Sequence, residues 1–365
     1  MKIFILSDIH STHTKRWVSS LSQCGCEIFL FGLLQCDASF YEKFPNVTIY
    51  NYNFSFHKKA FLSRWVLGKV LYFKSLRIIK RKIAEFKPDI LHAHYASSYG
   101  LLGALTHFHP YIISVWGSDV YSYPKAGWVY KKLLSHALKK ADAILSTSQC
   151  MAKETQLYTT KKIQITPFGV DTEIFKGDER QERNPIVIGT VKTLSKNYGI
   201  DLLIKAFAIV CKNNPSKDLQ LQIAGDGPDK EMLQNLCLEL NVRDKVQFLG
   251  FVANQHLPQI YQNFDIFVAL SHKESFGVVA IEAMACECPV VVSDAEGFCE
   301  VVVPEETGKI VKRDNPEMAA AAIQDLLDHP EKRKEMGKAG RAHVKKHYDW
   351  NQNVQTMISI YQQLH

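Results

Sequence analysis

The stretch that decides the fold is Ile266-Phe-Val-Ala269-Leu-Ser271-His-Lys-Glu274-Ser-Phe276-Gly277-Val-Val-Ala-Ile-Glu282-Ala-Met-Ala285. Its first four residues are an apolar run, which is typical of a buried strand. Polar residues follow as far as Gly277 and predict a loop, and 278–285 is rich in helix-forming residues. A strand, a loop and a helix in this order form one unit of an α/β domain with a parallel sheet.

The same order of elements repeats on both sides of this stretch. Each apolar run is followed by a helix-compatible segment, so the chain predicts two doubly wound α/β domains. In the first half the predicted strands are Lys2–Leu6, Glu27–Phe31, Asp89–His94, Tyr111–Val115 and Ala143–Ser146. In the second half they are Ile186–Thr190, Leu219–Ala224, Val246–Leu249, Ile266–Ala269 and Val290–Ser293.

A polar segment that contains proline, Lys176–Pro185, separates the two series of strands. We place one domain at 1–170 together with the terminal helix 350–365, which we expect to cross back to it, and the other at 171–349. Ligands of open α/β sheets bind at the carboxyl ends of the strands. We therefore expect the chemistry to face a cleft between the two domains.

Composition excludes several classes of protein. The chain has 365 residues, 46% hydrophobic and 22% charged, so it is neither a disordered tail nor a small disulfide scaffold. Its apolar runs are shorter than the ~20 residues that cross a bilayer, and Asp8 follows too early for a signal peptide. Nine cysteines without a Cys-x-x-Cys motif predict reduced thiols, and we expect a cytoplasmic protein.

The charge is distributed unevenly. Residues 1–175 carry 22 Lys and Arg against 11 Asp and Glu, which leaves 22 against 26 for 176–365. The basic surface therefore belongs to the first half, and this split predicts that the first half meets an anionic partner.

Two carboxylates flank the predicted loop and helix start. Glu274 precedes Phe276-Gly277, where free backbone N–H groups and the positive end of a helix suit a phosphate or diphosphate. Glu282 lies on the helix, and its oxygens can accept hydrogen bonds from a vicinal diol such as ribose. Each residue alone has an ordinary structural explanation: Glu274 as a solvated loop charge, Gly277 as a turn residue and Glu282 as an exposed helix residue. Their convergence at one strand end favours a binding site.

Three further segments occur in a characteristic order with this stretch, namely Gly189-Thr-Val-Lys192, Ala224-Gly225-Asp-Gly-Pro228 and Phe248-Leu-Gly-Phe251-Val252. Together they resemble the signature of the retaining glycosyltransferases of family 4, glycosyl transferases group 1. The resemblance implies the GT-B fold, with two Rossmann-like domains facing a central cleft. It also implies transfer of a hexose or N-acetylhexosamine from a nucleotide sugar, with UDP favoured over GDP.

By this resemblance Glu274 is catalytic and binds hydroxyls of the donor sugar. The amides of Phe276 and Gly277 bind the diphosphate, Glu282 binds the ribose, and backbone at Phe251 and Val252 holds the base.

The family usually supplies an Arg and a Lys after the first strand of this domain to neutralise the leaving diphosphate. Here Thr193 takes the place of the Arg, so we nominate Lys192 and Lys196 as the cations, against the alternative of two solvated surface lysines. The chain has no Asp-x-Asp motif, and we expect neither a metal nor a cofactor besides the nucleotide-sugar substrate.

The first domain supplies candidates for the acceptor side. His13 and Thr14 lie in the loop after the first strand, and His94 ends another strand. We expect His92 and His94 to point to opposite faces, so that only one reaches the cleft. Asp119, in Trp116-Gly-Ser-Asp119, either orients the acceptor or acts as its catalytic base, and the alternative is a helix-capping residue or one that shapes its loop.

The segment His57–Lys87 contains ten Lys or Arg and one acid, Glu85. Apolar residues recur in it at helical spacing, namely Phe61, Trp65, Tyr72, Leu76, Ile79, Ile83 and Phe86. This pattern predicts a basic amphipathic helix that adsorbs to an anionic membrane surface. The alternative is an ordinary helix that packs its apolar stripe on the sheet. No nucleic-acid motif accompanies the charge.

We therefore expect a peripheral enzyme at the inner face of the cell membrane. Its acceptor would be a polyprenyl-diphosphate-linked saccharide or similar glycolipid in bacterial surface polysaccharide biosynthesis, such as O-antigen or capsule. The same chemistry on a soluble small-molecule acceptor and a catalytically silent sugar-nucleotide-binding protein are the alternatives.

Overall fold

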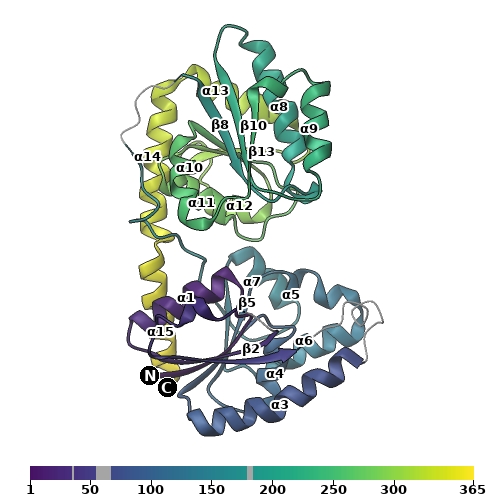
Figure 1. Ribbon diagram of the computed structural model, residues 1–365, viewed down its shortest axis with the longest axis vertical. Coiled ribbons are helices and arrows are strands. Elements are labelled where there is room, and N and C mark those ends of the chain that lie inside the picture. The colour runs from purple at the N-terminus through teal and green to yellow at the C-terminus, as the bar shows by residue number, and fades with distance from the viewer. Residues whose placement is uncertain (35–36, 55–66, 179–183) are drawn as a thin grey trace. The chain divides into compact units, whose positions relative to one another are not determined.

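The computed structural model describes residues 1–34, 37–54, 67–178 and 184–365 (Figure 1). The chain divides into two compact units. The first unit is Met1–Pro167 together with Val354–His365, and the second unit is Phe168–Asn353. Each unit is a parallel sheet with helices packed against it, as the alternation of strands and helices predicts.

The first unit holds a seven-stranded parallel sheet in the order β3-β2-β1-β4-β5-β6-β7. Its strands are β1 Lys2–Leu6, β2 Glu27–Leu34, β3 Val47–Phe54, β4 Ile90–His94, β5 Tyr111–Val115, β6 Ala143–Ser146 and β7 Ile163–Ile165. Its main helices are α1 Thr12–Gln23, α3 Leu67–Phe86, α4 Tyr99–Thr106, α5 Ser118–Tyr121, α6 Trp128–Lys140 and α7 Gln149–Gln156. A 3₁₀ turn, η2, covers Tyr123–Ala126.

The central strands β4 and β5 of the first unit are buried along their whole length, as in a parallel sheet that helices cover on both sides. Phe4 of β1 stacks on Phe29 of β2, with ring centroids 4.8 Å apart. Helix α4 contacts α3 on one side and α6 on the other, and the three helices form one layer (Figure 1). This layer turns the exposed sides of α3 and α6 to solvent.

The second unit holds a six-stranded parallel sheet in the order β10-β9-β8-β11-β12-β13. Its strands are β8 Ile186–Val191, β9 Leu219–Ala224, β10 Val246–Gly250, β11 Ile266–Ala269, β12 Val290–Ser293 and β13 Gly308–Val311. Its helices are α8 Ile200–Asn213, α9 Lys230–Glu239, α10 Leu257–Asn263, α11 Val278–Ala285, α12 Glu296–Val301, α13 Pro316–Asp328 and α14 Pro330–His347, and a 3₁₀ turn, η3, covers Lys196–Tyr198.

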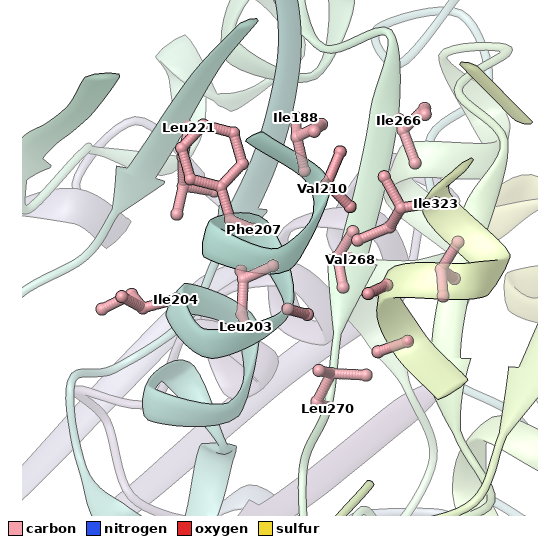
Figure 2. Packing of buried hydrophobic residues seen from close by; sticks show 14 of the residues in the cluster. Ile188, Leu203, Ile204, Phe207, Val210, Leu221, Ile266, Val268, Leu270 and Ile323 are labelled. Atoms are coloured by element: carbon pink, nitrogen blue, oxygen red, sulfur yellow. The ribbon is translucent and has the colours of Figure 1, made fainter. Parts of the chain in front are cut away.

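One hydrophobic cluster holds the second sheet to its helices. Figure 2 shows Phe207 of α8 and Ile323 of α13 packing against Ile188 and Val268 of the central strands. All four side chains are fully buried. Burial of side chains of this size stabilises the fold by about 1.5–3 kcal/mol each, so this cluster fixes the strand ends on which the site is built.

The loop 225–228 after β9 is a structural support. A Cβ atom at Gly225 would collide with the carbonyl oxygen of Lys192, and one at Gly227 with that of Leu194. The Lys192 N–H donates to the Ala224 carbonyl, and the Leu194 N–H to the Asp226 carbonyl, both over 3.0 Å. These glycines therefore let the loop press on the backbone that carries Lys192.

Most predicted elements are present, with ends that differ by a few residues. The predicted terminal helix is among them, and this helix, α15 Trp350–Leu364, contains residues of both units. The strands β3, β7 and β13 were not predicted, because they lack the continuous apolar run by which the other strands were identified. In β3 apolar and polar residues alternate, β7 has only three residues, and β13 begins at a glycine. Of the predicted basic helix, 57–66 lies outside the described residues.

Candidate active site

The candidate site lies where the order of strands in the second sheet reverses. From β8 the chain proceeds to β9 and β10 on one side, whereas β11 leads to β12 and β13 on the other. Lys192 follows β8 and Glu274 follows β11, so both residues leave the carboxyl ends of adjacent strands. This switch point is where open α/β sheets bind their ligands.

Lys192 and Glu274 form an ion pair in which Lys192 Nζ donates to Glu274 Oε2 over 2.6 Å. Their side chains are only 11% and 13% exposed. The ammonium group also lies 4.7 Å from the ring centroid of Tyr198. A pair this sheltered is screened less by salt than a surface pair.

Lys192 forms part of the wall of a cavity of about 300 Å³. The lining residues are Val191, Lys192, Thr193, Tyr198, Ala224, Gly225, Asp226, Phe251, Val252, Asn254, Leu257 and Val279. Phe251 is 79% exposed. The wall thus combines one lysine, backbone next to glycine and an exposed aromatic ring, which suits a ligand with both an anionic and a planar part.

Helix α11 begins beside this cavity. Gly277 precedes it with φ +96°, a backbone conformation that favours glycine, and Phe276 is buried against the rings of Phe168 and Tyr348. The Gly297 N–H donates to the Glu274 carbonyl over 3.0 Å. The loop is therefore fixed from both sides, and the first N–H groups of α11 have no intrahelical partner.

Glu282 accepts a hydrogen bond from the hydroxyl of Tyr261, which lies on α10, over 2.8 Å. Burial and the neighbouring Glu282 carboxylate raise the pKa of Tyr261 well above its usual value, so the phenol keeps its proton and donates. Tyr261 was not predicted as a site residue, because no local pattern links it to a helix 21 positions away.

The structure separates the two nominated lysines. Lys196 lies on η3, is exposed, and is not among the residues that line the cavity. Lys192 alone is sheltered, lines the cavity and meets Glu274. Lys192 is therefore the better candidate for contact with an anionic ligand.

The first unit has its own switch point, between β1 and β4. Ser7, just after β1, shares a hydrogen bond of 2.6 Å with Thr14 and one of 3.0 Å with His94 Nδ1. The ring of His94 lies 4.4 Å from that of Trp116, and the ring of His13 lies 5.7 Å from it. The three acceptor-side candidates are thus gathered around Ser7 and Trp116.

Burial keeps these imidazoles uncharged at neutral pH. Burial first, and then the Arg16 charge, lower the pKa of His13 to about 4. Burial, His92 and His13 lower the pKa of His94 well below its usual value. This group of residues can therefore exchange hydrogen bonds with a ligand, but it brings no positive charge.

The prediction that His92 and His94 point to opposite faces is wrong. Their rings lie 4.6 Å apart on the same face, since residues i and i+2 of a strand share a side. His92 is fully buried and bonds Tyr361 of α15 and Ser114, over 2.7 and 2.8 Å. It is a satisfied core histidine.

Asp119 lies fully buried, and its carboxylate oxygens accept hydrogen bonds from three backbone N–H groups, those of Ala96, Trp116 and Gly117. Burial raises its pKa, and these hydrogen bonds oppose the rise. The contacts favour the interpretation that Asp119 shapes its loop over the predicted role as a base.

The described part of the basic helix packs inward. Ile79 and Ile83 belong to the core of the first unit, and the Phe86 ring lies 5.5 Å from that of Phe29. This part of the apolar stripe therefore fills the fold rather than facing a membrane, as in the alternative given above. Its basic residues Lys74, Arg77, Lys80 and Arg81 are exposed.

Two features are absent from the residues that the structure describes. Among them, no helix has both the length and the apolar character needed to traverse a bilayer. Within the same ranges, no three His, Cys, Asp or Glu side chains gather in a way that could hold a metal ion.

Comparison with known families identifies the class of protein. The model of the glycosyl transferases group 1 matches residues 171–343, and that of the glycosyl transferase 4-like domain matches 2–148. The chain belongs to the glycosyl transferases group 1 and has the GT-B fold. It is a glycosyltransferase that takes its sugar from a nucleotide sugar.

The chain is similar to N-acetyl-alpha-D-glucosaminyl L-malate synthase of Bacillus anthracis, with 28% identity covering 75% of this chain and 74% of that one. It is 31% identical to D-inositol 3-phosphate glycosyltransferase of Segniliparus rotundus over 61% of this chain and 52% of that one. Anabaena HepE, solved in complex with UDP, has the same fold, with a TM-score of 0.80, 19% identity and full coverage of both chains.

Proposed function

We propose that the second unit binds a UDP-sugar beside the Lys192–Glu274 pair and that the sugar passes to a lipid-linked saccharide in surface polysaccharide assembly. The observation that carries the donor site is this sheltered ion pair at a switch point, next to a cavity. This pair supports the proposal because a sugar diphosphate needs both a cation and a carboxylate.

The two charged groups have complementary roles in this proposal. The donor diphosphate attracts the Lys192 ammonium, which releases Glu274 to accept hydrogen bonds from the sugar hydroxyls. The chain has Thr193 where the family has arginine, so Lys192 has to stabilise much of the charge that develops on the leaving group. The amides of Phe276 and Gly277 supply the remaining donors.

The reaction retains the configuration at the anomeric carbon and proceeds on one face of the sugar. The bond between that carbon and the diphosphate oxygen breaks with its electron pair, which leaves a nucleoside diphosphate. The acceptor hydroxyl forms the new bond and passes its proton to the leaving diphosphate oxygen. This route needs no strong base from the protein, in keeping with the buried and hydrogen-bonded carboxylate of Asp119.

The remaining donor contacts follow the predicted residues. Glu282, held by the Tyr261 hydroxyl, takes the ribose, and backbone near Phe251 and Val252 takes the base. The complex of HepE with UDP supports uracil as the base.

We propose a reaction without metal, since Lys192 and the helix amides act on the diphosphate. Turnover that EDTA leaves unchanged would agree with this, and loss of turnover restored by Mg²⁺ would refute it.

An anionic acceptor accounts for the excess of Lys and Arg in the first half of the chain. A polyprenyl diphosphate carries the required charge. The second candidate is a soluble anionic acceptor, which is favoured by the names of two relatives, one for L-malate and one for D-inositol 3-phosphate.

The test is release of nucleoside diphosphate from a panel of UDP- and GDP-sugars, with a bacterial lipid-linked saccharide extract or with soluble anionic acceptors. We expect release from one UDP-sugar that depends on the extract and is abolished in Glu274→Gln. Release of nucleoside diphosphate that depends on a soluble anionic acceptor instead would favour the second candidate. Release from GDP-sugars alone would overturn the assignment of the base.

A further inference from the structure

The solvent side of α6 in the first unit has an unusual composition. Its exposed residues are Trp128, Val129, Lys131, Lys132, His136, Lys139 and Lys140, and none of them is acidic. The opposite side of the helix, with Leu134, Ala137 and Leu138, is buried. The fold therefore explains the apolar residues on the inner side but leaves Trp128 and Val129 in water.

Trp128 is 70% exposed and Val129 is 42% exposed. Lys132 Nζ lies 4.8 Å from the Trp128 ring centroid, and Lys125 of η2 extends the basic surface on the preceding turn. Lys125 also meets one acid, Glu154, at 3.1 Å. We call Lys125, Trp128, Val129, Lys131 and Lys132 the α6 surface.

The lysines of α6 lie near both ends of the helix. Lys139 and Lys140 lie in the last turn of α6, where cations are stabilised by the helix dipole. Lys131 and Lys132 lie within the first five residues, at the positive end, and the first turn has no acid. No acid of the first turn offsets the charge of these two lysines, so the start of the helix attracts an anion.

Helix α14 of the second unit shows how an ordinary solvated helix distributes its charge. It mixes the two signs: the exposed acids Glu331 and Glu335 lie beside exposed Lys334 and Lys338, an acid occupies its first turn, and the further exposed Lys345 and Lys346 lie in its last turn. Solubility alone therefore does not require the uniform charge of α6.

We propose that the α6 surface docks the first unit on an anionic lipid bilayer. Trp128 and Val129 insert at the headgroup level while the lysines pair with lipid phosphates. The exposed basic residues of α3 lie in the same helical layer and add to the attraction (Figure 1). The inference deepens the proposed function, on which it rests, by naming the surface that brings the enzyme to a lipid-linked acceptor.

The test is sedimentation of the full-length protein with phosphatidylcholine vesicles, with and without phosphatidylglycerol. We expect binding that requires the anionic lipid and weakens with salt. The variant Lys131→Gln/Lys132→Gln should bind about 30-fold more weakly, since it loses two lysines that each contribute on the order of 1 kcal/mol near an anionic surface. Trp128→Ser should also weaken binding, whereas the matched control Lys334→Gln/Lys338→Gln on α14 should not.

Equal binding to both kinds of vesicle, or equal loss in the α6 and α14 variants, would overturn the inference. So would retention on heparin that needs the α6 lysines without any binding to vesicles, because the partner would then be a soluble polyanion. The thermal unfolding midpoint of each variant checks that it is folded.

Turnover is measured in the same samples. Vesicle binding through α6 by a protein that needs no lipid acceptor would refute the proposed acceptor and leave the docking surface standing. Extract-dependent turnover without vesicle binding would do the reverse.

Discussion

The two switch points of this molecule share a topology and differ in chemistry. In the first unit, the ends of β1 and β4 meet through Ser7, Thr14 and His94, which are buried and uncharged. In the second unit, the ends of β8 and β11 meet through Lys192 and Glu274, which are charged and lie beside a cavity. The same place in the same kind of sheet therefore presents two different kinds of chemistry.

The comparison shows which property the fold sets and which it leaves to the residues. The order of strands decides where loops converge, so both units bring their polar residues to the carboxyl ends of neighbouring central strands. The side chains on those loops decide the ligand. Hydroxyl and imidazole groups suit an uncharged sugar hydroxyl, whereas the lysine and the helix start suit a diphosphate.

The largest effect on this comparison should come from Glu274→Gln. We expect turnover to fall by at least about 10³-fold, since the variant loses the carboxylate proposed to bind the sugar, while affinity for UDP stays within a few-fold. Steady-state kinetics and calorimetric titration with UDP measure the two quantities. A parallel loss of UDP affinity would place Glu274 on the nucleotide rather than on the sugar.

Lys192→Met should lower turnover by about 10²-fold and weaken UDP binding, because the cation that meets the diphosphate is lost. Lys196→Met is the matched control, since Lys196 is an exposed lysine outside the cavity wall, and we expect little change from it. The same two measurements apply. Equal effects of both substitutions would contradict the separation of the two lysines drawn from the structure.

Acid should destabilise the first unit more than the second. Burial lowers the pKa of His92 to about 3 and that of His13 to about 4, so below pH 6.5 the unfolded chain takes up protons that the folded unit refuses. The contribution of these histidines to the free energy of unfolding is therefore fully present above pH 6.5. It is lost towards pH 4, by up to ~1.4 kcal/mol per pH unit for each fully buried histidine. In the second unit, the described histidine with a lowered pKa is His343.

Hydrogen exchange in the central strands of each unit, corrected for the intrinsic effect of pH, measures this difference. We expect β1 and β4 to lose protection between pH 7 and pH 5 while β8 and β11 keep most of theirs. Equal losses in both sheets would show that the buried imidazoles do not set the response to acid.

The smallest effect on activity should come from Asp119→Asn. The amide cannot reproduce every acceptor bond to the three backbone N–H groups, so the free energy of unfolding should fall by about 1–3 kcal/mol. Urea denaturation measures it. If stability is unchanged and turnover falls by orders of magnitude, Asp119 is the base after all.

Local sequence was sufficient to predict most strands and helices, and to predict that residues close together along the chain share a site. The run 266–285 predicted β11, its loop and α11, because an apolar strand and a helix start are read from neighbouring residues. The same run brought Glu274 next to Phe276 and Gly277. The terminal helix predicted over 350–365 is likewise present as α15.

Contacts between distant residues were beyond the reach of the sequence. The choice between Lys192 and Lys196 depends on an ion pair that spans 82 positions, and the support of Glu282 depends on a tyrosine of another helix. The inward packing of α3 was open for the same reason, since an apolar stripe looks alike whether it meets a sheet or a lipid.

The sequence by itself determined the two-domain α/β organisation, since hydrophobic period is a property of the chain alone, and its motifs were sufficient to show the resemblance to the glycosyltransferases. Tertiary structure decided which polar groups are sheltered, paired or left in water. It paired Lys192 with Glu274, buried His92 and Asp119, and left Trp128 exposed. The physical reason is that burial and pairing depend on distances in space, which hydrophobic packing of the whole unit sets.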